Sequence, residues 1–533
     1  MMNVDTEVAI ADLASGQAVV SWEGSGGPKD EVSVGFVRMT YPALSDAGGA
    51  SVFNCQMDAG GEVGWELTNY GAASAVVYDV VNGYRITVSD IQGGVLRVKL
   101  PAAGQNRVLW VLPVTDNGQE AAVENISIPM PAAGDADYII LTSRVLRTDG
   151  DPVQAYADYR ASAAGGGYRT AVVNVEDLYA QFGYGVDYHP VAIRNFVAWQ
   201  LRENPNFKYL FIIGKGREYT AIRSAANLSA ALGNTFFVPS FGYPASDNLL
   251  VSRIDKPTPR VGIGRLPAIS PAEVNIYLNK IRNMETAVAN APQTIAGKAW
   301  MKNILHLGGG STASEQQSIR NNLENMAALA ENGSFGAAVT GFYKTSTDPI
   351  QQSQSDAIFG RINEGVSILT FFGHSSAGTF DFNIDNPDNY QNVNKYPLML
   401  SLGCYSGNMF DEFRSIGERF ILLENGGAGV YGASRGLGFI HALSNFGRRF
   451  YELMSNDLYG QPVGDGIKAA IAHYENFTDQ AYGSLMEQFS IHGDPAFRLN
   501  PSLKPDYVVD PSKVVFTPQI ISTQKIVLQL PLT

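Results

Sequence analysis

The sequence predicts an α/β fold built on a mainly parallel sheet, with a β-sandwich before it and further β structure behind it. From residue 137 onward, short apolar runs alternate with helical patterns, as expected for a parallel sheet covered by helices on both faces. Residues 1–130 lack long helical patterns and alternate between apolar and polar positions. The last stretch, 504–533, returns to β alternation punctuated by proline.

The N-terminal segment, residues 1–130, contains short runs in which about every second residue is apolar. Gly, Asn, Asp and Pro separate the runs, which is the pattern of strands joined by turns. The runs are QAVVSWEG, VSVGFVRM, AVVYDV, YRITVSD, VLRVKL and RVLWVLPV. Short strands of this kind predict an antiparallel β-sandwich, and PMPAAGDAD at 129–137 predicts a linker behind it.

The next segment, 137–268, is expected to form a first α/β subdomain. Its apolar runs are short and rich in Val, Ile and Leu, which is typical of buried parallel strands. The predicted strands lie at 137–142, 170–175, 209–214 and 260–267, and the predicted helices near 152–163 and 189–203.

The segment 269–500 repeats this alternation and is expected to form a second α/β subdomain. Its predicted strands lie at 303–308, 366–376, 396–408 and 427–434, and its predicted helices at 270–290, 313–331, 440–458 and 463–477. The tail at 504–533 supplies only about two or three strands, too few for a sandwich of its own. We therefore expect the tail to be the start of a C-terminal β domain that the sequence does not complete.

Composition excludes several classes of function. The chain has 533 residues, with 38 Lys and Arg against 51 Asp and Glu, so its net charge is 38 − 51 = −13. An acidic chain without a basic cluster argues against nucleic acid or an anionic membrane as a partner. No run reaches the ~20 apolar residues of a membrane span, and the start lacks the pattern of a signal peptide. Two cysteines, Cys55 and Cys404, cannot form a disulfide framework.

Two buried strand-like runs each end beside a reactive side chain. The run VSILTFFGHSS delivers His374, and the run YPLMLSLGCYSGN delivers Cys404. A parallel sheet gathers the carboxyl ends of its strands at one edge, where ligands bind. We therefore expect His374 and Cys404 to face one another across a cleft, as a Cys–His nucleophile pair requires.

Cys404 is the candidate nucleophile and His374 its candidate base. A free thiol has a pKa of about 8.5, so it needs a neighbouring imidazole or a helix N-terminus to ionise at neutral pH. The chain after Cys404 is expected to turn at Gly407 and enter a helix, which would aim the Cys404 backbone N–H at an oxyanion. The simpler interpretation, a buried Cys and a core His at two strand ends, explains either residue alone better than it explains the pair.

The other histidines and the glycine motifs are weaker candidates. Four histidines occupy positions typical of structural residues: His189, His441, His473 and His492. His306 lies in a strand leading to the same sheet edge, so a zinc site of His306, His374 and Cys404 is an alternative, although no closely spaced ligand pair supports a metal. IIGKGREY and LGGGSTASE lack complete nucleotide-binding patterns and predict strand-to-helix turns without a cofactor.

Several motifs in order resemble those of the gingipain-like cysteine peptidases, family C25 of clan CD. They are YLFIIG, VGIGRLP, FFGHSS, GCYSGN and GDPAFRL, within about residues 137–500. Among these peptidases, the chain is most similar to the PorU-type sortases of the type IX secretion system. The resemblance implies a caspase-like three-layer α/β/α sandwich in two subdomains, followed by an immunoglobulin-like β domain that suits the tail at 504–533. It also implies that His374 and Cys404 are the catalytic pair.

Four further positions follow from the resemblance. Gingipains carry Gly directly after the His, and its N–H helps to bind the oxyanion; Ser375 stands here and retains that N–H. The turn in which gingipains place a His-orienting acid corresponds to LGGGSTASE, where Glu315 is the nearest acid; a dyad without a carboxylate and a triad with Glu315 both stay open. Arg435 falls in the specificity pocket, where it would favour an acidic P1 residue, unless it simply faces solvent. Asp247 matches a turn that is either structural or associated with calcium.

These observations predict a cysteine endopeptidase or transpeptidase that forms an acyl-enzyme on Cys404. For a sortase, the resemblance implies a protein substrate, the C-terminal signal domain of secreted cargo, and a place outside the cell or on the outer-membrane surface. Two alternatives stay open. One is a catalytically weak scaffold of the same fold in an outer-membrane secretion complex, and the other is a small-molecule hydrolase or acyltransferase that uses the same dyad.

Overall fold

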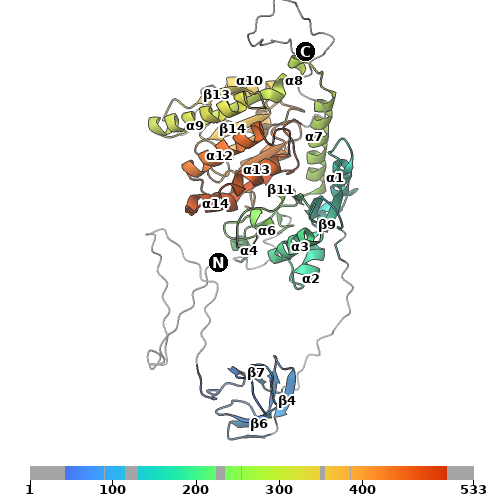
Figure 1. The fold of residues 1–533 in the computed structure, drawn as a ribbon, viewed down its shortest axis with the longest axis vertical. Coiled ribbons are helices and arrows are strands. Elements are labelled where there is room, and N and C mark those ends of the chain that lie inside the picture. Colours follow the sequence, from blue (N-terminus) through green and yellow to red (C-terminus); the bar gives the residue numbers. More distant parts are fainter. Residues whose placement is uncertain are drawn as a thin grey trace, which may run out of the picture. The chain divides into compact units, whose positions relative to one another are not determined.

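The computed structural model describes residues 42–88, 90–114, 130–131, 133–223, 235–253, 255–347, 354–384 and 386–500 (Figure 1). The chain divides into two compact units, Met1–Asn125 and Ile126–Thr533, which are described separately. The strands predicted from QAVVSWEG and VSVGFVRM, and the predicted β segment at 504–533, lie outside the described residues.

The described part of the N-terminal unit is a β-sandwich, as predicted. Its two antiparallel sheets have the strand orders β1-β7-β3-β4 and β2-β6-β5. The strands are β1 (Phe53–Met57), β2 (Val63–Leu67), β3 (Ala75–Asp79), β4 (Tyr84–Val88), β5 (Asp90–Gln92), β6 (Val95–Leu100) and β7 (Arg107–Leu112). Alternate residues of the two sheets, such as Trp65 and Leu67 of β2 and Leu109 and Val111 of β7, are buried in one core. The alternation in the sequence therefore marks the faces that meet.

The second unit is built on one 10-stranded sheet with the order β13-β12-β14-β15-β16-β17-β11-β10-β8-β9. Its strands are β8 (Tyr138–Thr142), β9 (Thr170–Asn174), β10 (Tyr209–Ile213), β11 (Gly262–Leu266), β12 (Asn303–Gly308), β13 (Ala338–Tyr343), β14 (Ile368–Phe372), β15 (Leu398–Leu402), β16 (Val430–Ser434) and β17 (Phe489–His492). All neighbouring pairs are parallel except β16 with β17. The mainly parallel sheet is thus confirmed.

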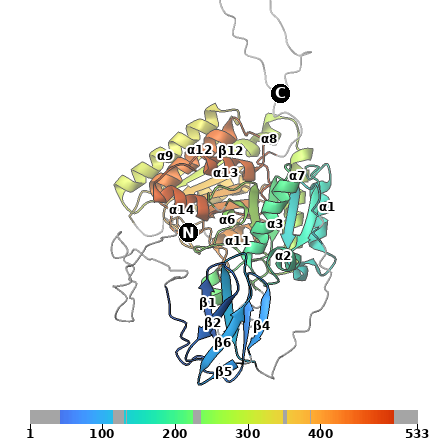
Figure 2. The ribbon, with the colours of Figure 1, turned by 60° about the horizontal axis from the view of Figure 1, so that its bottom comes forward.

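The central strands are apolar along their whole length because both faces of the sheet are covered. Every residue of β8, β10, β14 and β15 is buried. Helices α9, α13 and α14 pack around α12 (Figure 2), while α1 and α11 pack against α7. This arrangement is the three-layer α/β/α sandwich that the sequence predicts.

Several helices of this unit begin at side-chain caps, and α7 is an example. Pro271 stands in the first turn of the longest predicted helix, and the Ser270 side chain accepts the Glu273 N–H, a typical N-terminus. The helices are α1 (Pro152–Ala161), α2 (Val175–Phe182), α3 (Pro190–Glu203), α4 (Tyr219–Arg223), α6 (Asn248–Val251), α7 (Pro271–Asn290), α8 (Ile295–Lys302), α9 (Ala313–Asn332), α10 (Ser355–Glu364), α11 (Ile416–Leu422), α12 (Ile440–Ser455), α13 (Val463–Ala472) and α14 (Gln480–Gln488). Within the described ranges, the 3-10 helices η2 (Arg144–Arg147) and η4 (Pro387–Asn389) add single turns.

Two features of the structure go beyond the sequence prediction. Strand β17 pairs with β11 on one side and β16 on the other, so the two predicted α/β subdomains share one continuous sheet. The turn expected at Gly407 is present, but the helix follows only at Ile416, where Ser415 caps α11. Cys404 therefore does not directly precede the helix that follows it in the chain.

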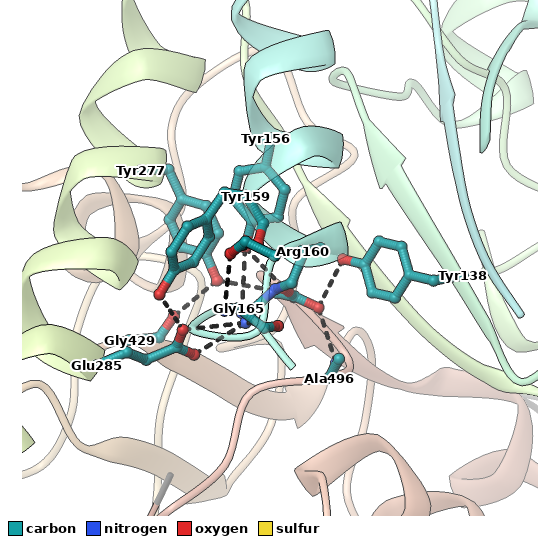
Figure 3. Close-up of polar contacts among 11 residues, drawn as sticks. Tyr138, Tyr156, Tyr159, Arg160, Gly165, Tyr277, Glu285, Gly429 and Ala496 are labelled. Carbon is teal, nitrogen blue, oxygen red and sulfur yellow. Dashed lines mark hydrogen bonds and ion pairs between the residues drawn. The ribbon is translucent and has the colours of Figure 1, made fainter. Parts of the chain in front are cut away.

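A buried charge network joins the first helix of this unit to its last turn (Figure 3). Arg160 of α1 donates from Nε to Asp494 at 2.6 Å and from Nη1 to Glu285 of α7 at 2.9 Å. The hydroxyls of Tyr138 and Tyr156 also donate to Asp494, at 2.8 and 2.6 Å. Each buried charge therefore has charged and neutral hydrogen-bond partners, which a buried ion pair needs to be tolerated.

Candidate active site

His374 and Cys404 follow two neighbouring strands at the same edge of the sheet. Strands β14 and β15 are parallel, with Phe372 opposite Leu402. His374 and Cys404 each come two residues after these paired positions. The topology therefore brings the backbones of both predicted catalytic residues to the same edge of the sheet.

Direct contacts hold the two loops together. The Ser375 hydroxyl donates to the carbonyl oxygen of Cys404 at 2.8 Å. A Cβ atom built on Gly403 would lie 2.2 Å from Ser375 Oγ and 3.0 Å from the Gly373 carbonyl oxygen. Only glycine at position 403 allows this close approach, so the small residues beside His374 and Cys404 serve to join their loops.

Glu315 lies next to His374. Strand β12 neighbours β14, and the turn after β12 leads into α9, whose N-cap Thr312 accepts the Glu315 N–H through its side chain. Oε1 of Glu315 lies 3.0 Å from Nε2 of His374; the side chains are 19% and 53% exposed. Oε2 accepts the Ser311 N–H at 2.7 Å. The N-cap of α9 thus places the carboxylate of Glu315 beside the imidazole of His374.

The surroundings of Glu315 favour its charged form. Burial raises the pKa of its carboxyl, but the hydrogen bonds from the Ser311 N–H and the His374 ring outweigh burial, so the pKa is lowered below its usual value. A carboxylate that receives hydrogen bonds at both oxygens is held in one orientation. Glu315 thus lies where a carboxylate that orients the imidazole would have to lie.

The thiol of Cys404 has backbone neighbours that the sequence analysis missed. The Gly438 N–H donates to Sγ at 3.3 Å, and Sγ lies 3.6 Å from the Gly438 carbonyl oxygen. Tyr405 adopts a positive φ of 57° and donates its N–H to the Gly436 carbonyl oxygen at 2.8 Å. The segment SRGLGF, at the end of β16, therefore lies directly beside Cys404. In the sequence, only the two glycines of this segment indicated that the chain could approach Cys404 so closely.

The backbone N–H groups of Ser375 and Cys404, the residues expected to form the oxyanion hole, donate to no protein acceptor within the described parts of the chain. The bridge between Ser375 and Phe380 is closed instead by the N–H groups of Ser376 and Asp381. Both N–H groups are thus available to a ligand oxygen.

Arg435 does not face solvent. It forms an ion pair with Glu218, and each side chain is 12% exposed. Its backbone N–H donates to the Gln488 carbonyl oxygen at 3.0 Å. The pairing compensates the guanidinium charge within the chain, so an acidic substrate side chain would have to compete with Glu218.

Three of the remaining histidines take structural positions. His306 is fully buried, its Nε2 lies 2.9 Å from the Tyr451 hydroxyl, and burial lowers its pKa to about 3. His492 is also fully buried, its Nε2 lies 3.1 Å from the Gly407 carbonyl oxygen, and burial lowers its pKa to about 4. His189 caps α3 through Nδ1, which accepts the Val191 N–H. His306 is therefore not a ligand of the zinc site considered above, because the His306 ring is directed to Tyr451.

The described residues contain no group of three His, Cys, Asp or Glu side chains arranged to hold a metal ion. Asp247, the residue considered for calcium, receives hydrogen bonds from the Arg265 guanidinium at 2.7 and 2.6 Å. Both side chains are buried. The arrangement matches the structural interpretation of this turn.

Comparisons with known proteins bear on the family and the fold of this chain. The profile of peptidase family C25 matches residues 132–500. No curated protein sequence matches the chain significantly. Among solved structures, the Arg-specific cysteine proteinase gingipain R (RgpB) is 15% identical, with a TM-score of 0.51 over 70% of this chain and 79% of that chain.

Two further structures are similar at the level of the fold. The complex of the pro- and mature domains of RgpB from Porphyromonas gingivalis is 15% identical, with a TM-score of 0.50 over 67% of this chain and 79% of that chain. A structure described only as a protease is 13% identical, with a TM-score of 0.52 over 72% and 82%. At these identities, the likeness establishes the fold alone. The family match, which covers well over half of the sequence, establishes that the chain belongs to peptidase family C25.

Proposed function

We propose that the chain is a cysteine endopeptidase whose catalytic residues are Cys404, His374 and Glu315. The observation that carries the proposal is the 3.0 Å contact between Glu315 and His374, at the sheet edge where Cys404 follows the neighbouring strand. A nucleophile, a base and a group that orients the base form the arrangement required for acyl transfer. Membership of family C25 supports the same class of reaction.

The two nitrogens of the imidazole have different roles in this mechanism. Because Nε2 is paired with Glu315, Nδ1 is the nitrogen that takes the proton of the Cys404 thiol. The thiolate attacks the peptide carbonyl, and the N–H groups of Ser375 and Cys404 stabilise the oxyanion. His374 then gives its proton to the leaving amine, and the C–N bond breaks to leave a thioester on Cys404.

The thioester is released by a second nucleophile. Water would regenerate the thiol and give a carboxylic acid product, as in a hydrolase. An amine would form a new amide instead, as in a sortase that joins secreted cargo to a surface glycolipid. We propose the sortase role for this chain, on the outer-membrane surface or outside the cell, because its acidic charge and its separate β-sandwich unit suit docking to a larger assembly. The described residues contain no helix long and apolar enough to cross a membrane.

The side chains around Cys404 suggest a preference for apolar residues beside the cleaved bond. Leu437 and Phe439 flank Gly438, the residue whose N–H reaches the thiol, and they are 58% and 46% exposed. Tyr405, next to Cys404, is 38% exposed. Apolar side chains left in contact with water beside a reactive group favour an apolar substrate segment. A peptide library with acidic, basic and apolar residues at each position would identify the preferred side chains.

The experiment that tests peptidase activity uses the full chain with cargo that carries its C-terminal signal domain. Cleavage is expected in the wild type and is expected to be lost in Cys404→Ala and His374→Ala, while Cys55→Ala serves as the matched control and cleaves normally. Cleavage that survives in Cys404→Ala would contradict the proposal. Adding a glycine peptide then separates the two fates of the thioester. An amine-ligated product supports the sortase role, and rapid casein digestion without such a product would make the chain a degradative peptidase.

A further inference from the structure

Asp381 is a buried acid that binds both the loop of His374 and the turn that leads to Glu315. Its side chain is 6% exposed. Its backbone N–H donates to the His374 carbonyl oxygen at 3.0 Å, and its Oδ2 accepts the Gly310 N–H at 2.8 Å. The mechanism described above makes no use of this residue. Its position nevertheless connects the two segments that have to stay in register for the imidazole to meet its carboxylate.

Glycines make room for the Asp381 carboxylate. A Cβ atom built on Gly309 would lie 2.2 Å from Oδ1, and one built on Gly373 would lie 2.8 Å from the same atom. Any larger side chain at either position would displace the carboxylate. Gly309, in the turn after β12, and Gly373, in the loop after β14, therefore allow the Asp381 carboxylate to contact both segments closely.

The hydrogen bonding of Asp381 is incomplete within the described chain. Oδ1 is buried and has no hydrogen-bond partner among the described residues. The Nζ atom of buried Lys344 lies 3.8 Å from Oδ2. Burial raises the pKa of the Asp381 carboxyl above its usual value, although the Gly310 N–H, Lys344 and His374 counteract the shift. A buried carboxylate with an unsatisfied oxygen is costly, so a role beyond the bond to Gly310 is needed to account for it.

We propose that Asp381 is a positioning residue of the catalytic centre, whose charge stabilises the imidazolium form of His374 and whose hydrogen bonds hold the Glu315 turn against the His374 loop. The inference rests on the proposed function, because His374 becomes an imidazolium only if it takes the Cys404 proton. Lys344 and His374 are the charged groups that act on Asp381. Glu315, paired with Nε2, is the other acid beside the imidazole, so two carboxylates favour its positive charge.

The test is the Asp381→Asn variant of the full chain. Asparagine keeps the size of the side chain and an oxygen for the Gly310 N–H, but it removes the charge. We expect kcat/KM for a peptide substrate to fall about 10-fold with little change in KM, and the alkaline limb of the pH profile to move down by about half a pH unit or more, because the imidazolium loses its proton more readily. Cys404 alkylation by iodoacetamide, which reports the thiolate that the imidazolium stabilises, should require a higher pH in the variant than in the wild type.

Two outcomes overturn the proposal. One is an unchanged rate in Asp381→Asn, and the other is a lower rate with the wild-type pH profile, which would assign Asp381 a purely structural role. If the Asn variant does not fold, Asp381→Ser replaces it, because its smaller hydroxyl fits the same space; a folded Ser variant with the wild-type profile would equally overturn the proposal. Asp411→Asn, at an exposed position after Cys404, is the matched control and should leave the profile unchanged.

Failure of the proposed function would look different. In that case His374→Ala and Cys404→Ala would leave substrate cleavage intact, whatever the Asp381 variants do. If both substitutions abolish cleavage and Asp381→Asn alone behaves as the wild type, the peptidase mechanism stands and only the role of Asp381 is rejected.

Discussion

Nε2 of His374 lies 3.0 Å from Oε1 of Glu315, which joins the loop after β14 to the first turn of α9. The other carboxylate oxygen accepts the Ser311 N–H. The carboxylate is therefore held at both oxygens, and in turn it fixes the orientation of the imidazole ring. A base held in this way keeps one nitrogen directed to its acid and leaves the other for the nucleophile.

Replacing Glu315 tests the value of this contact. Glu315→Gln should lower kcat by about 10-fold or more, because the amide no longer stabilises the imidazolium or selects its tautomer. Glu324→Gln is the matched control, since Glu324 is exposed on the same helix and pairs only with exposed Arg320 among the described contacts. Steady-state kinetics of both variants measures the contribution of Glu315 to kcat. Equal kcat values for Glu315→Gln and the wild type would mean that Cys404 and His374 act as a dyad without an orienting acid.

The two cysteines should differ in reactivity. Burial raises the pKa of the Cys55 thiol to about 11, whereas the Cys404 thiol receives the Gly438 N–H and has His374 on the adjoining loop. Below about pH 7, iodoacetamide should therefore modify Cys404 faster than Cys55, and His374→Ala should slow the reaction at Cys404 only. Peptide mapping of the alkylated chain measures both rates. Similar rates at the two thiols, unaffected by His374→Ala, would favour the scaffold alternative.

Two buried histidines should make the larger unit sensitive to acid. Their folded pKa values, about 3 for His306 and about 4 for His492, lie below the usual value of 6.5. Between about pH 6.5 and 4 the unfolded chain therefore binds protons that the folded chain does not, so stability falls as pH falls, by up to about 1.4 kcal/mol per pH unit for each histidine. Urea denaturation at several pH values measures this slope.

Substitution identifies which histidine contributes to the slope. His492→Gln should flatten the dependence of the unfolding free energy on pH, because glutamine does not titrate and its amide N–H can still donate to Gly407. His473→Gln, at an exposed position, is the matched control and should keep the wild-type slope. A slope in His492→Gln equal to that of the wild type would show that His492 takes up its proton equally in both states.

The network around Arg160 should matter strongly for stability. Arg160→Met leaves Glu285 and Asp494 buried without their cation, which should lower the free energy of unfolding by about 3 kcal/mol or more. Arg361→Met removes an exposed pair with Glu364 in the same unit and should change it by less than about 0.5 kcal/mol. Similar losses in both variants would mean that the buried network contributes no more than a surface ion pair.

The sequence predicted the central architecture because its strongest signals are local. Buried runs such as YLFII of β10 and LMLSL of β15 are apolar throughout, and helices such as α7 carry a cap, a proline and a long apolar period. Strand β17 was missed because its sequence, FSIH, is short and follows α14 directly. Its pairing with β11 and β16 depends on residues far away in the chain, which no local pattern shows.

Only those residues of the candidate site that directly follow a strand could be predicted from the sequence. His374 and Cys404 follow apolar runs, so their common edge could be inferred from topology. The roles of Gly438 and Asp381 depend on contacts between loops distant in sequence, and neither residue carries a motif of its own. Glu315 was an open candidate, and only the three-dimensional path of the turn after β12 brings its carboxylate to the imidazole.

The most direct test of the central claim is covalent labelling with a peptide that carries an electrophilic carbonyl group, followed by mass-spectrometric mapping. The wild-type chain should be modified at Cys404 alone, and His374→Ala should lose most of the labelling while its fold is retained. Glu315→Gln should be labelled more slowly than the wild type. Modification of Cys55 instead, or labelling of Cys404 that is the same in the wild type and in His374→Ala, would contradict the assignment of Cys404 and His374 as a catalytic pair.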